Sequence, residues 1–265
     1  ELVEHPCTLT NMGGLYGDVI ADHVFGFILC FARNLHKYVR QQMATRWAPI
    51  GGPNPSQVFI TGPGTVSDAD RAHVHLSDCT LGIVGLGSIG SEVARRGLAF
   101  GMRVLAVDAI QEKAPEGVEA LWRPDRLNDL LAEGDFIVIA APHTPETEGL
   151  FRREQFQCMK NTAFLINIGR GAIVKLDDLV ASLDAGEIAG AALDVFEVEP
   201  PARDNPLFLM DNVVLSPHMG GVDEMSIEAM GLEAASCIIK LFLGEWPTGA
   251  VVNDQLKGEW SAIES

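Results

Sequence analysis

The chain has 265 residues, of which 47% are hydrophobic and 21% are charged, a composition typical of one or two well-packed globular domains. Acidic residues outnumber basic ones by 36 to 19, which gives a formal charge of −17 at pH 7. Such a charge repels phosphate backbones and anionic lipid surfaces, so we expect neither nucleic acid nor membrane as a partner. The five cysteines are scattered and form no C-x-x-C pair, which favours reduced thiols and a cytoplasmic location.

The first long helical pattern runs over residues 19–43, and a Gly- and Pro-rich stretch at 47–75 is expected to form a surface loop or arm. From residue 80 onward, short apolar runs alternate with amphipathic stretches. The apolar runs predict strands over 80–87, 103–108, 135–142, 163–171, 189–196 and 212–218. Helices are predicted over 88–101, 123–134, 175–187 and 223–244. This alternation predicts an α/β fold with a doubly wound parallel sheet that helices cover on both faces.

A glycine-rich turn follows the strand at 80–87. In GLGSIG, three glycines have the spacing G-x-G-x-x-G: Gly85, Gly87 and Gly90. This spacing alone is a weak signal, but here a strand precedes it and a helix follows it. Gly85 then permits a tight turn, Gly87 lets the backbone approach a pyrophosphate, and Gly90 lets helix and strand pack closely. The amides of Ser88 and Ile89 would face the phosphates, so the sequence predicts the dinucleotide site of a Rossmann fold.

Asp108 ends the strand that follows the glycine-rich turn. A carboxylate at this position accepts hydrogen bonds from the adenosine ribose and repels a 2′-phosphate. No arginine occurs in the next residues, AIQEK, so the sequence favours NAD over NADP.

Polar side chains stand at or just beyond the ends of three later strands: Arg170 in NIGRG, Asp194 and Glu199 in DVFEVEP, and His218 in SPH. Ligands of doubly wound sheets bind beyond the carboxyl ends of the strands, so we expect these side chains to converge on one crevice. Reduction of a 2-oxo acid needs a proton donor, a cation that holds the substrate carboxylate, and an acid that keeps the donor charged.

Five motifs resemble, in order and approximate spacing, those of the D-isomer-specific 2-hydroxyacid dehydrogenases: TLGIVGLGSIG, APHTPET, NIGRGAIV, GAALDVFEVEP and NVVLSPHMGG. The resemblance implies hydride transfer between NAD(H) and a small 2-hydroxy or 2-oxo acid of D configuration. It implies that Arg170 binds the substrate, that His218 is the catalytic acid and base, and that Glu199 is the partner of His218. Asp194 would lie near the nicotinamide carboxamide. Further residues would line the cofactor cleft: Ala141, Pro142, Thr147, Ile168, Gly169, Gly220 and Gly221.

Members of this family carry a smaller substrate domain built from both ends of the chain. The resemblance implies that residues 23–218 are the dinucleotide-binding domain, that 1–22 are a remnant of the substrate domain, and that 219–265 return to it. We expect this second domain to be incomplete and turnover by this chain to be weak or absent. The resemblance also implies a homodimer, with the 47–75 arm near its interface.

Other interpretations remain open on the sequence alone. A lone histidine before glycines is more often a capping or core residue, and an arginine between glycines often pairs with a surface acid. His73 and His75 lack further ligands for zinc, so we expect no metal site. His5, His23 and His36 are interpreted as surface or packing residues. The alternative functions are an NAD-binding regulatory or corepressor-like module and an S-adenosylmethionine-dependent methyltransferase, which gives no reason for the later polar residues.

Overall fold

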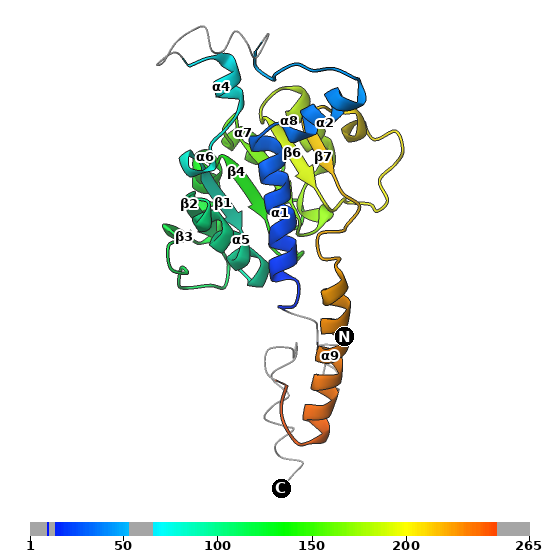
Figure 1. Cartoon of the computed structure of the whole chain (residues 1–265). Helices are drawn as coiled ribbons and strands as arrows, with labels where there is room; N and C mark the ends of the chain where they lie inside the picture. Colours follow the sequence, from blue (N-terminus) through cyan, green and yellow to red (C-terminus); the bar gives the residue numbers. More distant parts are fainter. Residues whose placement is uncertain (1–9, 11–13, 53–65, 248–265) are drawn as a thin grey trace.

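The computed structural model describes residues 10, 14–52 and 66–247 (Figure 1). In these ranges a seven-stranded sheet has the order β3-β2-β1-β4-β5-β6-β7, and every neighbouring pair is parallel. The strands are β1 Thr80–Val84, β2 Arg103–Val107, β3 Ala120–Trp122, β4 Phe136–Ile139, β5 Phe164–Asn167, β6 Gly190–Leu193 and β7 Val213–Leu215. The order reverses its direction between β1 and β4, which is the topological switch point of a doubly wound sheet. The predicted α/β fold class is confirmed.

The helices are α1 Gly17–Ala32, α2 Leu35–Met43, α4 Asp68–Ala72, α5 Ser88–Ala99, α6 Leu127–Glu133, α7 Arg153–Cys158, α8 Leu176–Asp184 and α9 Glu224–Phe242. Short 3-10 turns are η1 Leu76–Asp78, η2 Pro124–Arg126, η3 Gly171–Ile173 and η4 Pro206–Leu209. Six strands lie within their predicted ranges. Both β3 and α7 were missed, because segments of three and six residues are too short to show a hydrophobic periodicity.

The prediction of one continuous helix over 19–43 was wrong. The chain breaks between α1 and α2 at Asn34, which adopts a left-handed conformation with φ 53°. The Asn34 side chain donates a hydrogen bond of 2.6 Å to the carbonyl oxygen of Ala72, so a residue distant in sequence holds the break. The arm at 47–75 was also not purely a loop, because it contains α4, whose first turn is closed by a capping box between Ser67 and Asp70. Residues 53–65 of the arm lie outside the described residues.

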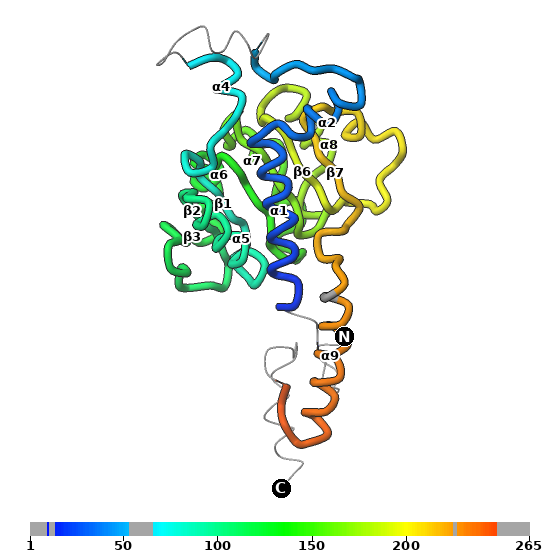
Figure 2. Tube along the Cα trace, viewed as in Figure 1, coloured from blue at the N-terminus to red at the C-terminus, as the bar shows by residue number. Residues whose placement is uncertain are grey.

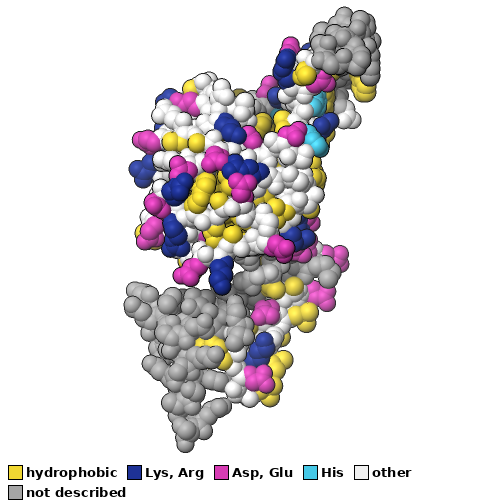
Figure 3. All heavy atoms as spheres, turned by 90° about the vertical axis from the view of Figure 1, so that its left-hand side faces the viewer, with side chains coloured by type: hydrophobic (Ala, Val, Ile, Leu, Met, Phe, Trp, Pro, Cys, Tyr) yellow, Lys and Arg dark blue, Asp and Glu magenta, His cyan; other side chains and the backbone are white. Residues whose placement is uncertain are grey.

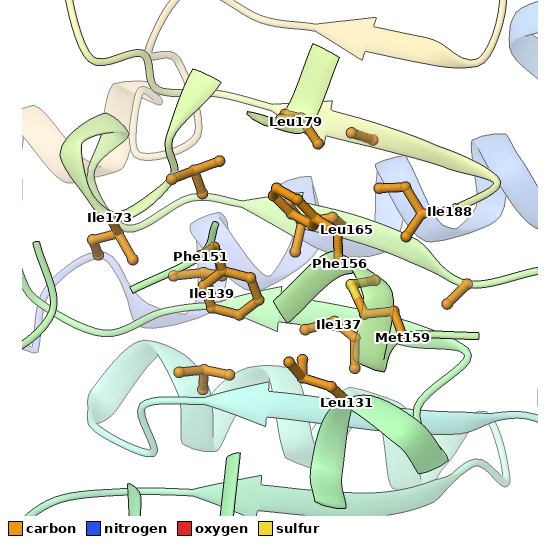
Figure 4. Close-up of a cluster of buried hydrophobic side chains, with 14 of the residues drawn as sticks. Leu131, Ile137, Ile139, Phe151, Phe156, Met159, Leu165, Ile173, Leu179 and Ile188 are labelled. Carbon is orange, nitrogen blue, oxygen red and sulfur yellow. The ribbon is translucent and has the colours of Figure 1, made fainter. Parts of the chain in front are cut away.

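Two hydrophobic clusters fill the two faces of the sheet. Along β4, Ile137 and Ile139 belong to the cluster under α6, α7 and α8, whereas Phe136 and Val138 belong to the cluster under α1 and α5. This alternation follows from the two-residue repeat of a strand. Figure 4 shows the first cluster, in which Phe156 and its neighbours interdigitate between sheet and helices. Full burial of each such side chain contributes roughly 1.5–3 kcal/mol to folding, so the sheet forms a rigid base for the site at its edge.

Helix α1 packs along α5, and Arg96 of α5 ties the two helices together. The Arg96 guanidinium lies 2.7 Å from the Asp22 carboxylate and donates a hydrogen bond of 2.9 Å to the carbonyl oxygen of Asp18. The predicted domain boundary between residues 22 and 23 therefore falls inside α1, a helix packed against the dinucleotide-binding unit.

Helix α9 leaves the sheet after β7 and extends away from it (Figures 1 and 2). Hydrophobic side chains lie along this projecting part of the molecule (Figure 3). They include Ile227, Leu232, Ile238, Ile239 and Phe242, each more than half exposed. Residues 1–9, 11–13 and 248–265 of the predicted second domain lie outside the described residues. Within the described part of the chain, no helix combines the length and apolar character needed to cross a bilayer.

Candidate active site

A cavity of about 480 Å³ opens where the carboxyl ends of the strands meet α1 and α9. Its lining includes six residues predicted for the site: Ile89, Ile168, Arg170, Asp194, His218 and Gly221. They come from four separate segments of the chain, which the parallel sheet brings to one edge. Tyr16 and Ile20 of the α1 region, and Met230 of α9, complete the wall.

His218 and Glu199 form a hydrogen-bonded pair at the rim of this cavity. The Nδ1 atom of His218 lies 2.8 Å from Oε2 of Glu199, and Glu199 Oε1 accepts a hydrogen bond of 3.0 Å from the Phe196 amide. Burial raises the pKa of Glu199, but the hydrogen bonds from His218 and Phe196 and the charge of Arg170 outweigh it, so this pKa lies below its ordinary value. Glu199 is therefore a carboxylate at neutral pH.

His218 also faces a second cavity, of about 600 Å³, on the side of Glu199. Apolar side chains dominate the lining of this second cavity, among them Phe196, Pro200, Pro201 and Phe208. The imidazole of His218 is half exposed and stands between the two cavities.

Arg170 follows β5 on a short turn that Asn167 holds in place. The buried Asn167 amide donates to the carbonyl oxygen of Arg170 over 3.1 Å, and its side-chain oxygen accepts from the Gly169 amide over 3.1 Å. The exposed Arg170 guanidinium donates to the carbonyl oxygen of Gly169. Asn167 was not predicted as a site residue, although a lone polar residue at the end of an apolar strand is a usable signal for such a role.

The glycine-rich turn has the geometry that the sequence predicted. Gly85 has φ +96°, and a Cβ atom there would lie 2.6 Å from the Ala141 amide nitrogen. A Cβ at Gly90 would lie 2.0 Å from the Gly85 carbonyl oxygen. A Cβ at Gly87 would meet nothing within 4 Å, so open space lies over the turn. No side chain caps α5 at Gly87, and the helix directs its amides from Ser88 onward into that space. The turn at Gly85–Gly90 and the first amides of α5 together form a cradle that fits a pyrophosphate group.

Asp108 joins the glycine-rich turn to the segment after β2. Its carboxylate accepts hydrogen bonds from the amides of Leu86, Ile110 and Gln111 over 2.6, 2.7 and 2.8 Å. Burial raises the pKa of Asp108, but these three hydrogen bonds and the charge of Arg123 bring it below its ordinary value. Arg123, which follows β3, lies beyond AIQEK and was not predicted from the sequence to act on Asp108.

The segment after β4 closes the cleft beside the glycines. The Thr147 hydroxyl donates to the Pro142 carbonyl oxygen over 2.8 Å and accepts from the Thr144 amide over 2.8 Å. Thr147 therefore shapes this loop from within. A Cβ at Gly169 would lie 2.7 Å from the Ala141 carbonyl oxygen, so the turns after β4 and β5 touch through their backbones.

Asp194, at the end of β6, holds the turn that carries His218. It is 3% exposed, and its carboxylate accepts hydrogen bonds from the amides of Met219 and Gly220, each over 2.9 Å. The Asp194 carbonyl oxygen accepts from the His218 amide over 2.9 Å. His218 has φ +57°, a left-handed conformation that costs about 1 kcal/mol or more in a non-glycine residue. These three hydrogen bonds hold that conformation in place.

Two residues near Asp194 were not assigned to the site from the sequence. The Ser216 hydroxyl donates to the Asp194 carboxylate, and Nε2 of His23 lies 3.0 Å from the Ser216 oxygen. The interpretation of His23 as a surface or packing residue missed this contact. Among the described residues, no group of three or more His, Cys, Asp or Glu side chains has the arrangement of a metal site.

Comparisons with known proteins agree with this architecture. Residues 25–220 match the family model for the NAD-binding domain of D-isomer-specific 2-hydroxyacid dehydrogenases. The chain is 36% identical over 258 residues to a glyoxylate reductase of Pyrococcus horikoshii, covering 97% of this chain and 73% of the relative.

Solved structures also resemble the chain. A D-isomer-specific 2-hydroxyacid dehydrogenase from Xanthobacter autotrophicus, in complex with NADPH and MES, has a TM-score of 0.78 and 27% identity, over 96% of this chain and 98% of that one. A member of the same class from Lactobacillus delbrueckii, in its NAD-complexed form, has a TM-score of 0.73 and 26% identity, over 93% and 72% of the two chains.

The fold, the glycine-rich cradle and these matches define a nicotinamide-dependent oxidoreductase with NAD as its cofactor. The chain belongs to the D-isomer-specific 2-hydroxyacid dehydrogenase family.

Proposed function

We propose that this protein reduces a small 2-oxo acid to the D-2-hydroxy acid, and catalyses the reverse oxidation, with His218, Glu199 and Arg170 as its catalytic residues. The observation that carries the proposal is that a guanidinium and an imidazole line one cavity at the strand ends, while a carboxylate contacts the imidazole from outside that cavity. Bound NADH supplies the hydride for reduction, and NAD⁺ accepts it in the reverse direction.

His218 transfers the proton. A carboxylate can only accept hydrogen bonds, so the contact with Glu199 places a proton on Nδ1 of His218. Nε2 is then the atom that exchanges a proton with the substrate oxygen. In reduction the protonated ring donates from Nε2 to the carbonyl oxygen, and the Glu199 carboxylate stabilises the positive charge before transfer. In oxidation the neutral ring accepts the hydroxyl proton at the same nitrogen.

Arg170 holds the substrate. A guanidinium presents paired N–H donors that match the geometry of a carboxylate. Because the side chain is exposed at the cavity and, among the described residues, is hydrogen-bonded only to Gly169, its remaining donors are available for the substrate carboxylate and carbonyl oxygen.

The residues that hold NAD are proposed to be those of the cradle and the cleft. The amides of Ser88 and Ile89 face the pyrophosphate, and Asp108 accepts from the adenosine ribose while its charge disfavours a 2′-phosphate. The Asp194 carboxylate faces the cavity that would receive the nicotinamide carboxamide. The turns at Ala141–Pro142 and Gly220–Gly221 line the same cleft.

The substrate is proposed to be glyoxylate or a similarly small 2-oxo acid, which is supported by the glyoxylate reductases among the relatives. The test is oxidation of NADH, followed by absorbance, with glyoxylate, hydroxypyruvate, pyruvate and 2-oxoisocaproate, and the same series with NADPH. We expect turnover to be fastest with the smallest acids and with NADH. Quenching of tryptophan fluorescence by NADH without turnover of any acid would agree with the weak turnover expected from the sequence and with the regulatory module alike, whereas turnover would exclude both.

We also propose that the protein acts in the cytoplasm as a homodimer that associates through α2. Four apolar side chains recur at intervals of four residues along α2 and just beyond it: Leu35, Val39, Met43 and Trp47. Met43 and Trp47 are 82% and 94% exposed, and the same surface borders a cavity of about 780 Å³. A contiguous exposed apolar stripe of this kind is typical of an association surface.

A further inference from the structure

His23 of α1 reaches across the molecule to the end of β7. Its Nε2 atom lies 3.0 Å from the hydroxyl oxygen of Ser216, a residue 193 positions later in the sequence. The ring packs edge-on against Phe27, with centroids 4.5 Å apart at an angle of 76°. A Cβ atom added at Gly220 would lie 3.5 Å from Cδ2 of His23, so the imidazole adjoins the turn that carries His218.

The direction of the hydrogen bonds follows from the chemistry of the three groups. Asp194 is 3% exposed, and an ionised carboxylate only accepts hydrogen bonds. The single hydroxyl proton of Ser216 is donated to that carboxylate. The Ser216 oxygen must therefore accept from His23, which requires a proton on Nε2 of His23. The result is a directed chain from His23 to Ser216 to Asp194.

This chain ends on the groups that fix the position of His218. The Asp194 carboxylate accepts hydrogen bonds from the amides of Met219 and Gly220, and its carbonyl oxygen accepts one from the amide of His218. If the Ser216 hydroxyl loses its donor at His23, it is free to rotate away from Asp194. The Asp194 carboxylate then loses one of the contacts that set its orientation. Its hydrogen bonds with the amides of Met219 and Gly220 become weaker as a result.

We propose that His23 is a positioning residue for catalysis, which acts through Ser216 and Asp194 to hold the 216–220 turn and with it the imidazole of His218. The proposal rests on the proposed function of His218 as the acid and base. A displacement of a reacting group by about 1 Å lowers the rate by up to roughly a hundredfold, so a loosened turn lowers kcat even though His23 does not line the cavity beside Arg170.

The test compares His23→Phe, which keeps the ring packing against Phe27 but removes the N–H donor, with His23→Gln, whose amide reaches the position of Nε2. The primary measurement is hydrogen exchange of the amides of residues 218–220, read by mass spectrometry in full-length protein without cofactor. We expect His23→Phe to raise their exchange rate about fivefold, the effect of weakening one buried hydrogen-bond network, with β4 and β5 unchanged. His23→Gln should restore slow exchange.

Kinetics with NADH and glyoxylate provide the second measurement. His23→Phe should lower kcat about tenfold with little change in the NADH dissociation constant, and His23→Gln should recover most of the loss. Ser216→Ala should have the same effect, and the double variant should be no worse than either single one, because both break the same chain. His36→Phe is the matched control, since His36 also packs edge-on against a phenylalanine of α1, Phe31, but lies away from the site.

Unchanged exchange in His23→Phe, equal losses in the Phe and Gln variants, or additive effects of the His23 and Ser216 variants would each overturn the proposal. Failure of the proposed function is distinguishable. Full kcat in His218→Gln would reject the role of His218, whereas the exchange measurement would still report whether His23 holds the turn.

Discussion

Nδ1 of His218 lies 2.8 Å from Oε2 of Glu199, although the two residues are nineteen positions apart. Glu199 is itself fixed by the Phe196 amide, and His218 by the carbonyl oxygen of Asp194. Both members of the pair are therefore held by backbone groups that lie just after β6. The pair leaves one ring nitrogen, Nε2, for chemistry, and this division of the two nitrogens underlies the first two predictions.

Replacement of His218 by glutamine should lower kcat by about 10²–10⁴-fold, the usual contribution of a general acid or base. NADH binding should persist, because the cradle at Gly85–Gly90 is untouched. Steady-state kinetics and fluorescence titration with NADH check the two parts. His143→Gln is the control, since His143 is an exposed histidine whose nearest charged partner is Glu148 at 3.6 Å. Equal turnover of wild type and His218→Gln would reject the assignment.

Glu199→Gln should lower kcat about tenfold or more, because the imidazolium loses its charged partner. The pKa of Glu199 is below its ordinary value, so the carboxylate is ionised throughout the neutral range. Wild type should therefore keep a higher kcat than the variant from neutral pH down to the ordinary carboxyl range. This difference should disappear only as the pH drops through the lowered pKa, where Glu199 of wild type is protonated too.

The control for this experiment is Glu197→Gln. Glu197 lies two residues earlier but pairs with Lys175 and the Leu176 amide rather than with His218. A kcat loss in Glu197→Gln as large as that in Glu199→Gln would show that the charge of the whole segment matters rather than the pair.

Two glycines of the cradle should behave differently when replaced by alanine. Gly87→Ala adds a Cβ that meets no atom within 4 Å, so thermal unfolding should change little while NADH affinity falls, because the methyl group enters the space for the pyrophosphate. Gly90→Ala adds a Cβ 2.0 Å from the Gly85 carbonyl oxygen, which should destabilise the fold by about 1–3 kcal/mol as well as weaken binding. Calorimetry and fluorescence titration separate the two outcomes. Equal unfolding temperatures for both variants would contradict this interpretation.

The carboxylate of Asp108 should stabilise the fold in a pH-dependent way. Its pKa is lowered in the folded protein by three backbone hydrogen bonds and Arg123, despite burial. The stabilisation is therefore fully present above the unfolded pKa of about 3.9 and is lost as the pH falls through the lower folded pKa. Asp108→Asn should cost about 1 kcal/mol of unfolding free energy at pH 7, measured with urea, because it weakens charged hydrogen bonds. The difference should shrink as the pH falls below the unfolded pKa of about 3.9, and a difference that stays constant down to the acid limit of folding would exclude a charge effect.

The α2 surface should determine the oligomeric state. A double variant with Val39→Asp and Met43→Asp places two charges in the apolar stripe and should convert a dimer into a monomer in sedimentation velocity experiments. Phe242→Ser is the control, because its side chain is 88% exposed and belongs to α9, a helix that lies far from α2 in Figure 1. If the double variant remains dimeric, the dimer interface does not involve α2.

Local patterns were sufficient for six strands of the sheet and for the glycine-rich turn. The apolar strands were found because both faces of a parallel sheet are buried, as in Phe136–Ile139 of β4. The break at Asn34 was not found, since asparagine is unremarkable within a helical pattern and only its hydrogen bond to Ala72 fixes the left-handed turn. The pattern of residues around a position does not report a partner that far away in the chain.

The same limit applies to the site. Arg170, Asp194, Glu199 and His218 stand at or just after strand ends, where a general rule about parallel sheets identifies them. His23 lies in the middle of an apolar helix and contacts Ser216 only after the fold brings α1 beside β7. Arg123 approaches Asp108 only because β3 pairs with β2. Residues that act through tertiary contacts can be identified only once the structure is known.

Because the His218 imidazole stands between the two cavities, its position affects the order of events in a catalytic cycle. Cofactor and substrate would fill the cavity beside Arg170. The second cavity, which Pro200, Pro201 and Phe208 border, would still adjoin the His218–Glu199 pair. Water entering there meets Nδ1, which already carries the proton bound to Glu199, so the proton that Nε2 gives up is replaced only after the product has left the first cavity.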